Sequence, residues 1–210
     1  PSFSRDGKQL VYSMIGRQSG QWELVIIDLD NPVRRKFIGF GLFPNFSPTE
    51  DKIVYQRARE RGTRWFSVWT MDIEGGEAVR PTEIAASANA ACITPEWSPD
   101  GQYVVFCTVI DPGADGNTRP QQADVWMTTA DGRNRINLTN SRFTNLQPTW
   151  APDGTIYFVS DRSQSGVENI WSTQPRKAIR LVSPTPRAAD PATASGDATA
   201  GDASASVPTP

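Results

Sequence analysis

Histidine is absent from this 210-residue chain. Its absence excludes Ser-His-Asp and Cys-His nucleophile systems and removes the commonest imidazole metal ligand. The chain also lacks a Gly-x-Ser-x-Gly elbow, a Gly-x-x-x-x-Gly-Lys phosphate loop and a Cys-x-x-Cys pair. We therefore expect a protein that is not an enzyme and that uses no cofactor and no metal.

Long apolar runs and an excess of positive charge are also missing. No stretch of about 18 apolar residues occurs, so we expect no membrane span. The formal net charge is −2 and the pI is about 5.3, which argues against nucleic acid as a partner. The chain begins without an initiator Met or a signal peptide, so we interpret it as a fragment or a processed form.

Cysteine is scarce, and the two that occur, Cys92 and Cys107, flank a single turn. If the turn centres on Pro99 and Asp100, the two residues face each other across antiparallel strands, close enough for a disulfide. A bulge at Gly101 would shift the register by one residue and place the sulfurs on a diagonal. Two buried, reduced thiols are the other interpretation.

A repeated segment is the main feature of what is present. It begins with proline, carries an aromatic residue two positions later and continues through a turn into a β-branched stretch. Its four copies are Pro1–Ser13, Pro44–Gln56, Pro95–Cys107 and Pro148–Val159. Starting prolines that lie 43, 51 and 53 residues apart have the period of a propeller or a solenoid.

Each copy predicts the same four-stranded unit. An inner strand is followed by a type I turn with glycine at the position that needs a positive φ, and then by a second strand. Third strands are predicted at 23–27, 67–71, 124–129 and 169–172, and fourth strands at 35–38, 78–82, 135–139 and 178–183. The fold class is therefore all-β, a β-propeller of four recognisable antiparallel blades.

The blades are expected at about 1–40, 41–83, 91–140 and 145–183, which together form one domain over 1–183. Residues 184–210 are rich in Ala, Thr, Ser, Pro, Asp and Gly. Such a segment cannot bury enough surface to offset its ordering entropy, so we expect a disordered tail or linker there.

The repeat resembles the TolB-like family of β-propellers, a WD40-like Pro-Asp repeat family. The matching motifs are Trp150–Gly154, Ser160-Asp161-Arg162, Asn169–Trp171, Asp124–Trp126, Asp131-Gly132 and Asn137–Thr139. The first two copies depart more, since the second has Pro48-Thr-Glu-Asp51 in its turn and neither keeps Ser-Asp-Arg. The family more often looks six-bladed, so the resemblance implies that N-terminal blades are missing here.

The resemblance also implies a function. It favours a non-enzymatic, protein-binding scaffold of the cell envelope, periplasmic or otherwise exported, with an unidentified protein as partner. The alternative is the gating propeller of a prolyl oligopeptidase-like serine peptidase whose catalytic domain lies outside this chain. An arc of four blades would leave two blade faces uncovered, which allows self-association through those faces.

Strand order predicts where binding occurs. Connections from second to third strands, and from blade to blade, emerge on one face, which we call the loop face; the tight turns emerge on the opposite, turn face. The long loops at 14–21, 57–65, 83–91, 109–123 and 140–145 all belong to the loop face, so we expect function there. Arg57, Arg59, Arg61 and Arg64 in the second loop suggest contact with an anion or acidic partner. The other interpretation is a solvated loop that Glu60 partly neutralises.

Overall fold

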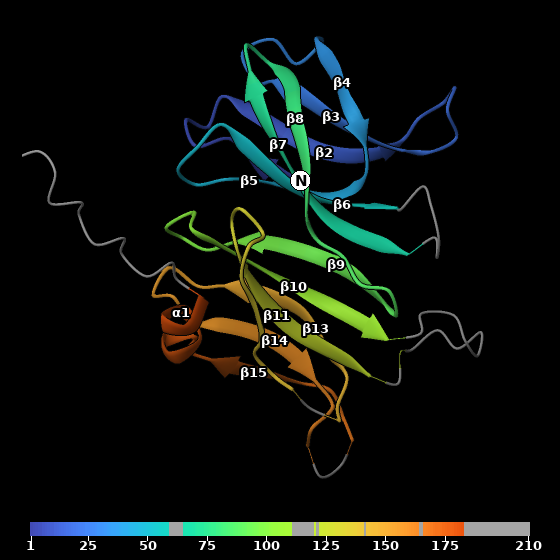
Figure 1. The fold of residues 1–210 in the computed structure, drawn as a ribbon. Coiled ribbons are helices and arrows are strands. Elements are labelled where there is room, and N and C mark those ends of the chain that lie inside the picture. Colours follow the sequence, from blue (N-terminus) through green and yellow to red (C-terminus); the bar gives the residue numbers. More distant parts are fainter. Residues whose placement is uncertain (59–64, 111–119, 121, 141, 164–165, 183–210) are drawn as a thin grey trace, which may run out of the picture.

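The structure is a computed structural model, and it describes residues 1–58, 65–110, 120, 122–140, 142–163 and 166–182. Four antiparallel sheets succeed one another along the chain (Figure 1). Within each sheet the strands pair in sequence order from the inner strand outwards. The all-β, four-bladed propeller predicted from the repeat is therefore confirmed.

The strand bounds follow the repeat. The first blade holds β1 (Ser2–Phe3), β2 (Gln9–Ile15), β3 (Trp22–Asp28) and β4 (Arg35–Phe40). The second holds β5 (Leu42–Phe46), β6 (Lys52–Ala58), β7 (Phe66–Glu74) and β8 (Glu77–Ala85). The third holds β9 (Ala90–Trp97), β10 (Tyr103–Ile110), β11 (Ala123–Thr129) and β12 (Arg135–Asn137). The fourth holds β13 (Asn145–Trp150), β14 (Ile156–Ser160) and β15 (Asn169–Thr173).

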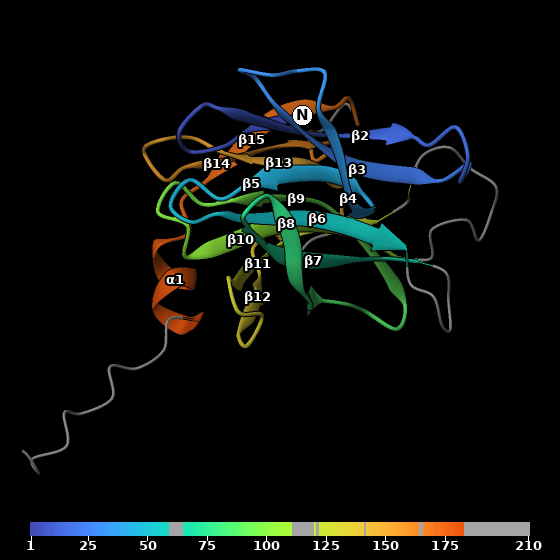
Figure 2. The same cartoon turned by 90° about the horizontal axis from the view of Figure 1, so that it is seen from above.

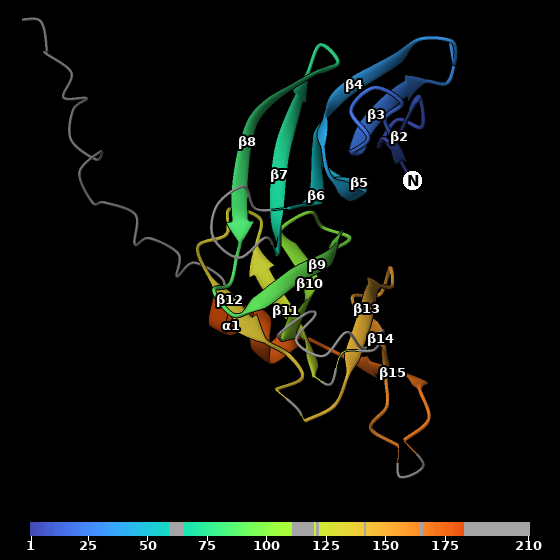
Figure 3. The ribbon, with the colours of Figure 1, turned by 90° about the vertical axis from the view of Figure 1, so that its right-hand side faces the viewer.

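Apolar side chains on the blade faces pack consecutive blades together. Val11 and Leu24 of the first blade meet Ile53 and Tyr55 of the second. Further clusters join the second blade to the third, and the third to the fourth. Figure 3 shows the resulting arc, with the first and fourth blades at its two ends. The larger six-bladed propeller remains a prediction.

The expected last strand at 178–183 is wrong, because the chain forms the helix α1 (Arg176–Val182) instead. The segment Arg-Lys-Ala-Ile-Arg-Leu-Val contains five good helix formers and no β-strand alternation. Ala178 and Ile179 pack on the apolar cluster between the third and fourth blades. The helix contacts β12 of the third blade (Figure 2), and the described part of the fourth blade has three strands.

Hydrogen bonds between inner strands link each blade to the next at one repeat position, the residue after the starting proline. Ser2 Oγ accepts from the Phe46 amide at 3.0 Å, and Asn45 Nδ2 donates to the Pro95 carbonyl at 2.9 Å. Glu96 Oε1 accepts from the Thr149 hydroxyl at 3.1 Å and from the Trp150 amide at 3.3 Å. The side chains differ, but each one contacts the backbone of the following inner strand.

The residue before the starting proline carries a second repeated feature, a left-handed backbone. Phe43, Thr94 and Gln147 have φ values of 50°, 50° and 52°, and the strand register shifts beside each of them. Such a conformation costs a non-glycine residue about 1–3 kcal/mol. The amide of Thr94 donates to Gln56 Oε1 of the preceding blade at 2.8 Å, so the neighbouring blade supports the bulge.

Two turn glycines provide a matched test of blade packing. Gly132 and Gly154 both have positive φ, at 74° and 82°. A Cβ on Gly132 would lie 2.7 Å from the Ile84 carbonyl oxygen of the second blade, whereas a Cβ on Gly154 would meet nothing within 4 Å. We expect Gly154→Ala to cost about 1–2 kcal/mol through φ alone, and Gly132→Ala to cost about 1–3 kcal/mol more through overpacking. Urea unfolding of both variants measures the difference, and equal losses would contradict this packing.

Glu96 gives a pH-dependent test. Burial raises the pKa of its carboxyl, although hydrogen bonds from Thr149 and Trp150 oppose the rise. The folded protein therefore favours the protonated carboxyl. The resulting stabilisation is fully present below the ordinary pKa of about 4.3, and it is lost as the pH rises through the raised pKa of the folded protein. Glu96→Gln keeps an acceptor oxygen without the charge. We expect its gain in unfolding free energy over the parent protein to grow from pH 4 to pH 7; a gain independent of pH would contradict this.

Candidate functional site

The strand order puts the long connections on one face and the tight turns on the other. Because strands pair in the order of the sequence, the β2–β3, β6–β7, β10–β11 and β14–β15 connections share a face with the blade-to-blade connections. This arrangement is the loop face predicted from the sequence. Residues 59–64, 111–119, 121, 141 and 164–165 of its loops lie outside the described part of the chain.

A hollow of about 330 Å³ opens on the loop face between the first and second blades. Trp22 at the start of β3 and Phe40 at the end of β4 come from the first blade, and Phe66 at the start of β7 comes from the second. Trp22 is 46% exposed and Phe40 39% exposed. Gln21, Gly41, Leu42, Arg57 and Ala58 complete the lining. The hollow offers apolar and aromatic surface beside a positive charge.

Arg57 is the one predicted arginine that the structure describes. It lies near the end of β6, lines this hollow, and its guanidinium lies 5.2 Å from the centre of the Trp69 ring. Nearby Tyr55 is buried, which raises the pKa of its phenol to about 12, although Arg57 opposes the rise. Arg59, Arg61 and Arg64 lie outside the described residues, so the anion contact of the four arginines stays a prediction.

The Ser160-Asp161-Arg162 motif ties its loop to the fourth blade through local hydrogen bonds. Arg162 donates to Ser160 Oγ at 3.1 Å and to Asn145 Oδ1 at 2.6 Å, while Asp161 accepts from the Thr144 amide at 2.9 Å. The Arg162 guanidinium also lies over the rings of Phe143, Phe158 and Trp171. Burial lowers the pKa of Arg162, against the charges of Asp124 and Asp161. This arginine therefore joins β13, β14 and β15.

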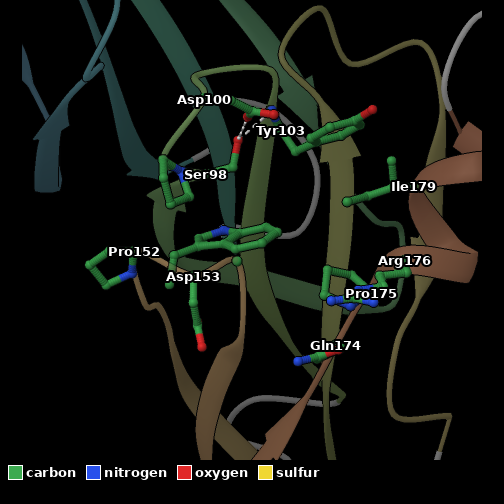
Figure 4. A pocket seen from close by; sticks show the side chains of 12 residues that line it. Ser98, Asp100, Tyr103, Pro152, Asp153, Gln174, Pro175, Arg176 and Ile179 are labelled. Carbon is green, nitrogen blue, oxygen red and sulfur yellow. Dashed lines mark hydrogen bonds between the residues drawn. The ribbon is translucent and has the colours of Figure 1, made fainter.

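A second hollow, of about 300 Å³, lies on the turn face between the third and fourth blades and α1. Figure 4 shows Ser98, Asp100 and Tyr103 on one side, Pro152 and Asp153 on another, and Pro175, Arg176 and Ile179 opposite. Pro99, Trp150, Gly154 and Gln174 also line it. The sequence does not indicate this hollow, because turn chemistry alone accounts for the Pro-Asp-Gly residues at its edge.

Cys92 and Cys107 are free and buried in the structure, and they are not joined by a disulfide. Cys92 pairs with Thr108, and Cys107 with Ile93, so the facing register is replaced by a register shifted by one residue. Neighbouring positions on a strand point to opposite faces of the sheet. Accordingly Cys92 packs among residues of the second blade and Cys107 against Phe158 of the fourth. Burial raises the pKa of the Cys107 thiol to about 12.

Among the residues that the structure describes, no group of three or more His, Cys, Asp or Glu side chains is placed to hold a metal ion. Within the same residues, no helix is long and apolar enough to cross a membrane.

The chain matches no family model. It is 28% identical over 162 residues to the uncharacterized protein Atu1656 of Agrobacterium fabrum strain C58. The match covers 72% of this chain and 50% of that protein. The chain thus spans about half the length of the curated relative that it matches.

Solved structures show the same fold. The putative TolB of Agrobacterium tumefaciens superposes with a TM-score of 0.63 at 20% identity, over 82% of this chain and 59% of that one. TolB of Acinetobacter baumannii superposes with a TM-score of 0.62 at 16% identity, over 83% of this chain and 40% of that one. A prolyl endopeptidase gives 0.59 at 15%, over 83% of this chain and 26% of that one. The chain is therefore a β-propeller similar in structure to TolB and to peptidase propellers.

Thiol labelling tests the cysteine geometry. We expect no reaction of Cys92 or Cys107 with a thiol reagent in the folded protein, because both side chains are buried. After unfolding without reductant, both thiols should react. An Asn31→Cys variant places a thiol at an exposed turn position and checks that the reagent is active. Fewer than two reactive thiols in the unfolded parent protein would contradict the register described here.

Proposed function

We propose that the chain is a non-catalytic, protein-binding scaffold of the cell envelope that holds its partner on the loop face. The observation that carries the proposal is the hollow between the first and second blades. A rigid pair of blades presents Trp22, Phe40 and Phe66 there beside Arg57. Aromatic residues and arginine are the side chains most enriched at the energetic centres of protein interfaces.

The chemistry of the hollow defines the partner surface. The aromatic lining suits an apolar anchor side chain, and Arg57 suits a carboxylate next to that anchor. Ile15, which pairs with Trp22, and Phe43, which follows Leu42 in β5, are also large and exposed, so apolar surface continues beside the hollow. An acidic protein segment with an aromatic or aliphatic anchor is the partner that this lining fits.

The likeness to TolB supports the cell-envelope assignment as an analogy at the level of fold. Export to the periplasm belongs to the same proposal.

The peptidase propeller remains the second candidate, favoured by the fold shared with a prolyl endopeptidase. A fluorophosphonate probe applied to cells that make the full-length protein separates the two. Covalent labelling of the polypeptide that contains this chain would support the peptidase, whereas labelling of other serine hydrolases alone would support the scaffold.

Photocrosslinking tests the loop face directly. A photoreactive amino acid at Gln21, in cells that make the protein, should yield one discrete partner adduct. We expect Trp22→Ala and Phe40→Ala to reduce this adduct at least tenfold, because loss of a buried aromatic anchor typically costs about 2 kcal/mol or more of binding free energy. Val33→Ala is the matched control, since Val33 is 88% exposed and apolar but lies in the tight β3–β4 turn.

An adduct whose yield is unchanged by both aromatic substitutions, or that is lost in Val33→Ala alone, would overturn the proposal, because the aromatic lining would then not hold the partner.

A further inference from the structure

The turn-face hollow departs from the repeat. At the junction of the second and third blades, a Cβ on Gly101 would lie 2.1 Å from Thr49 Oγ1, so the two turns press against each other. At the next junction, the equivalent Gly154 has open space around it. Here the expected outer strand is replaced by α1, and the hollow opens between the helix and the two turns. The same motif therefore closes one junction and opens another.

The lining has a distinct chemistry. Tyr103 and Trp150 supply aromatic rings, and the walls include Pro99, Pro152 and Pro175. Two exposed carboxylates lie at the turns: Asp100 Oδ1 accepts from the Ser98 hydroxyl, and Asp153 Oδ1 accepts from the Thr155 amide. Grooves lined by aromatic rings bind proline-containing segments in the extended polyproline II conformation. Carboxylates beside such a groove favour a basic residue in the bound segment.

The chain itself contains such a segment directly after α1. Pro184-Thr-Pro-Arg187 supplies two prolines and an arginine, in a stretch with few large apolar side chains. We propose that the turn-face hollow is a binding site for an extended, proline-containing basic segment, and that its occupant is Pro184–Arg187 of this chain.

The distances allow this occupancy. Pro175, Arg176 and Ile179 at the start of the helix line the hollow, and the helix ends at Val182. Seven helical residues rise about 10 Å, and a polyproline II segment advances about 3.1 Å per residue. A chain that turns at Ser183 therefore covers the length of α1 again within four residues.

Because the segment Pro184–Arg187 is covalently connected to α1, weak contacts are sufficient for it to occupy the hollow. A short flexible connection gives an effective concentration in the millimolar range. A segment whose free peptide binds with a Kd near 1 mM would thus occupy the hollow about half of the time. The positive charge of Arg176 at the rim repels Arg187, so the favourable electrostatic interaction comes from the carboxylates of Asp100 and Asp153.

The test uses the full chain labelled with 5-fluorotryptophan, with the Trp150 signal assigned by Trp150→Phe. We expect Arg187→Ala and the pair Pro184→Ala with Pro186→Ala to shift the 19F signal of Trp150. The pair Pro208→Ala with Pro210→Ala, at the far end of the same tail, is the control and should leave the signal in place. A Trp150 signal identical in all these proteins would overturn the proposal.

Addition of the segment in trans tests the site itself. A peptide with the sequence of residues 183–191, added to the Arg187→Ala protein, should return the Trp150 signal to its original position, and a scrambled peptide should not. Asp100→Asn should weaken this effect at least threefold. Asp6→Asn should not, although Asp6 Oδ1 accepts the same two turn hydrogen bonds, from Ser4 and Lys8. Equal action of both peptides, or equal loss in both variants, would overturn the proposal.

Discussion

The contact between successive inner strands is the constraint on which the other features depend. Ser2, Asn45 and Glu96 each form a hydrogen bond with the backbone of the next inner strand, so the second, third and fourth blades are each positioned by the blade before them. The bulges before the repeat prolines carry an energetic cost. The backbone amide of Thr94, in one such bulge, donates a hydrogen bond to Gln56 of the preceding blade. Blade faces can then pack their apolar residues in a fixed register. Both hollows lie at such junctions, since each is lined by two neighbouring blades.

The sequence predicted what depends on local chemistry. Pro-Asp-Gly turns with glycine at positive φ, such as the one ending in Gly101, identify the strand ends, and the alternation of strands fixes which face carries the loops. The propeller and its loop face followed from these signals. The linking residues Ser2, Asn45 and Glu96 were not recognised, because they share a position and a role but no side-chain type.

The failures have physical reasons as well. The repeat predicts a strand at residues 178–183, although their own propensity and the packing of Ala178 and Ile179 favour a helix. The facing register of Cys92 and Cys107 failed because the turn pairs Trp97 with Val104, and the register shift beside Thr94 then leaves Cys92 opposite Thr108. Trp22 and Phe66 lie 44 positions apart, so the loop-face hollow required knowledge of how two blades meet. Arg57 was found because clustered arginines are visible in the sequence.

Gly132 fits closely against Ile84, and Gly101 against Thr49, although the repeat copies look interchangeable. At this junction the third blade therefore has a shape that matches the second blade. A protein assembled with the second and third blades exchanged would keep every repeat motif and still lose these fits. Duplication can multiply such a unit only if each new copy afterwards diverges to suit its neighbour. At this junction the order of the blades thus depends on small turn residues, rather than on the repeat that makes the blades recognisable.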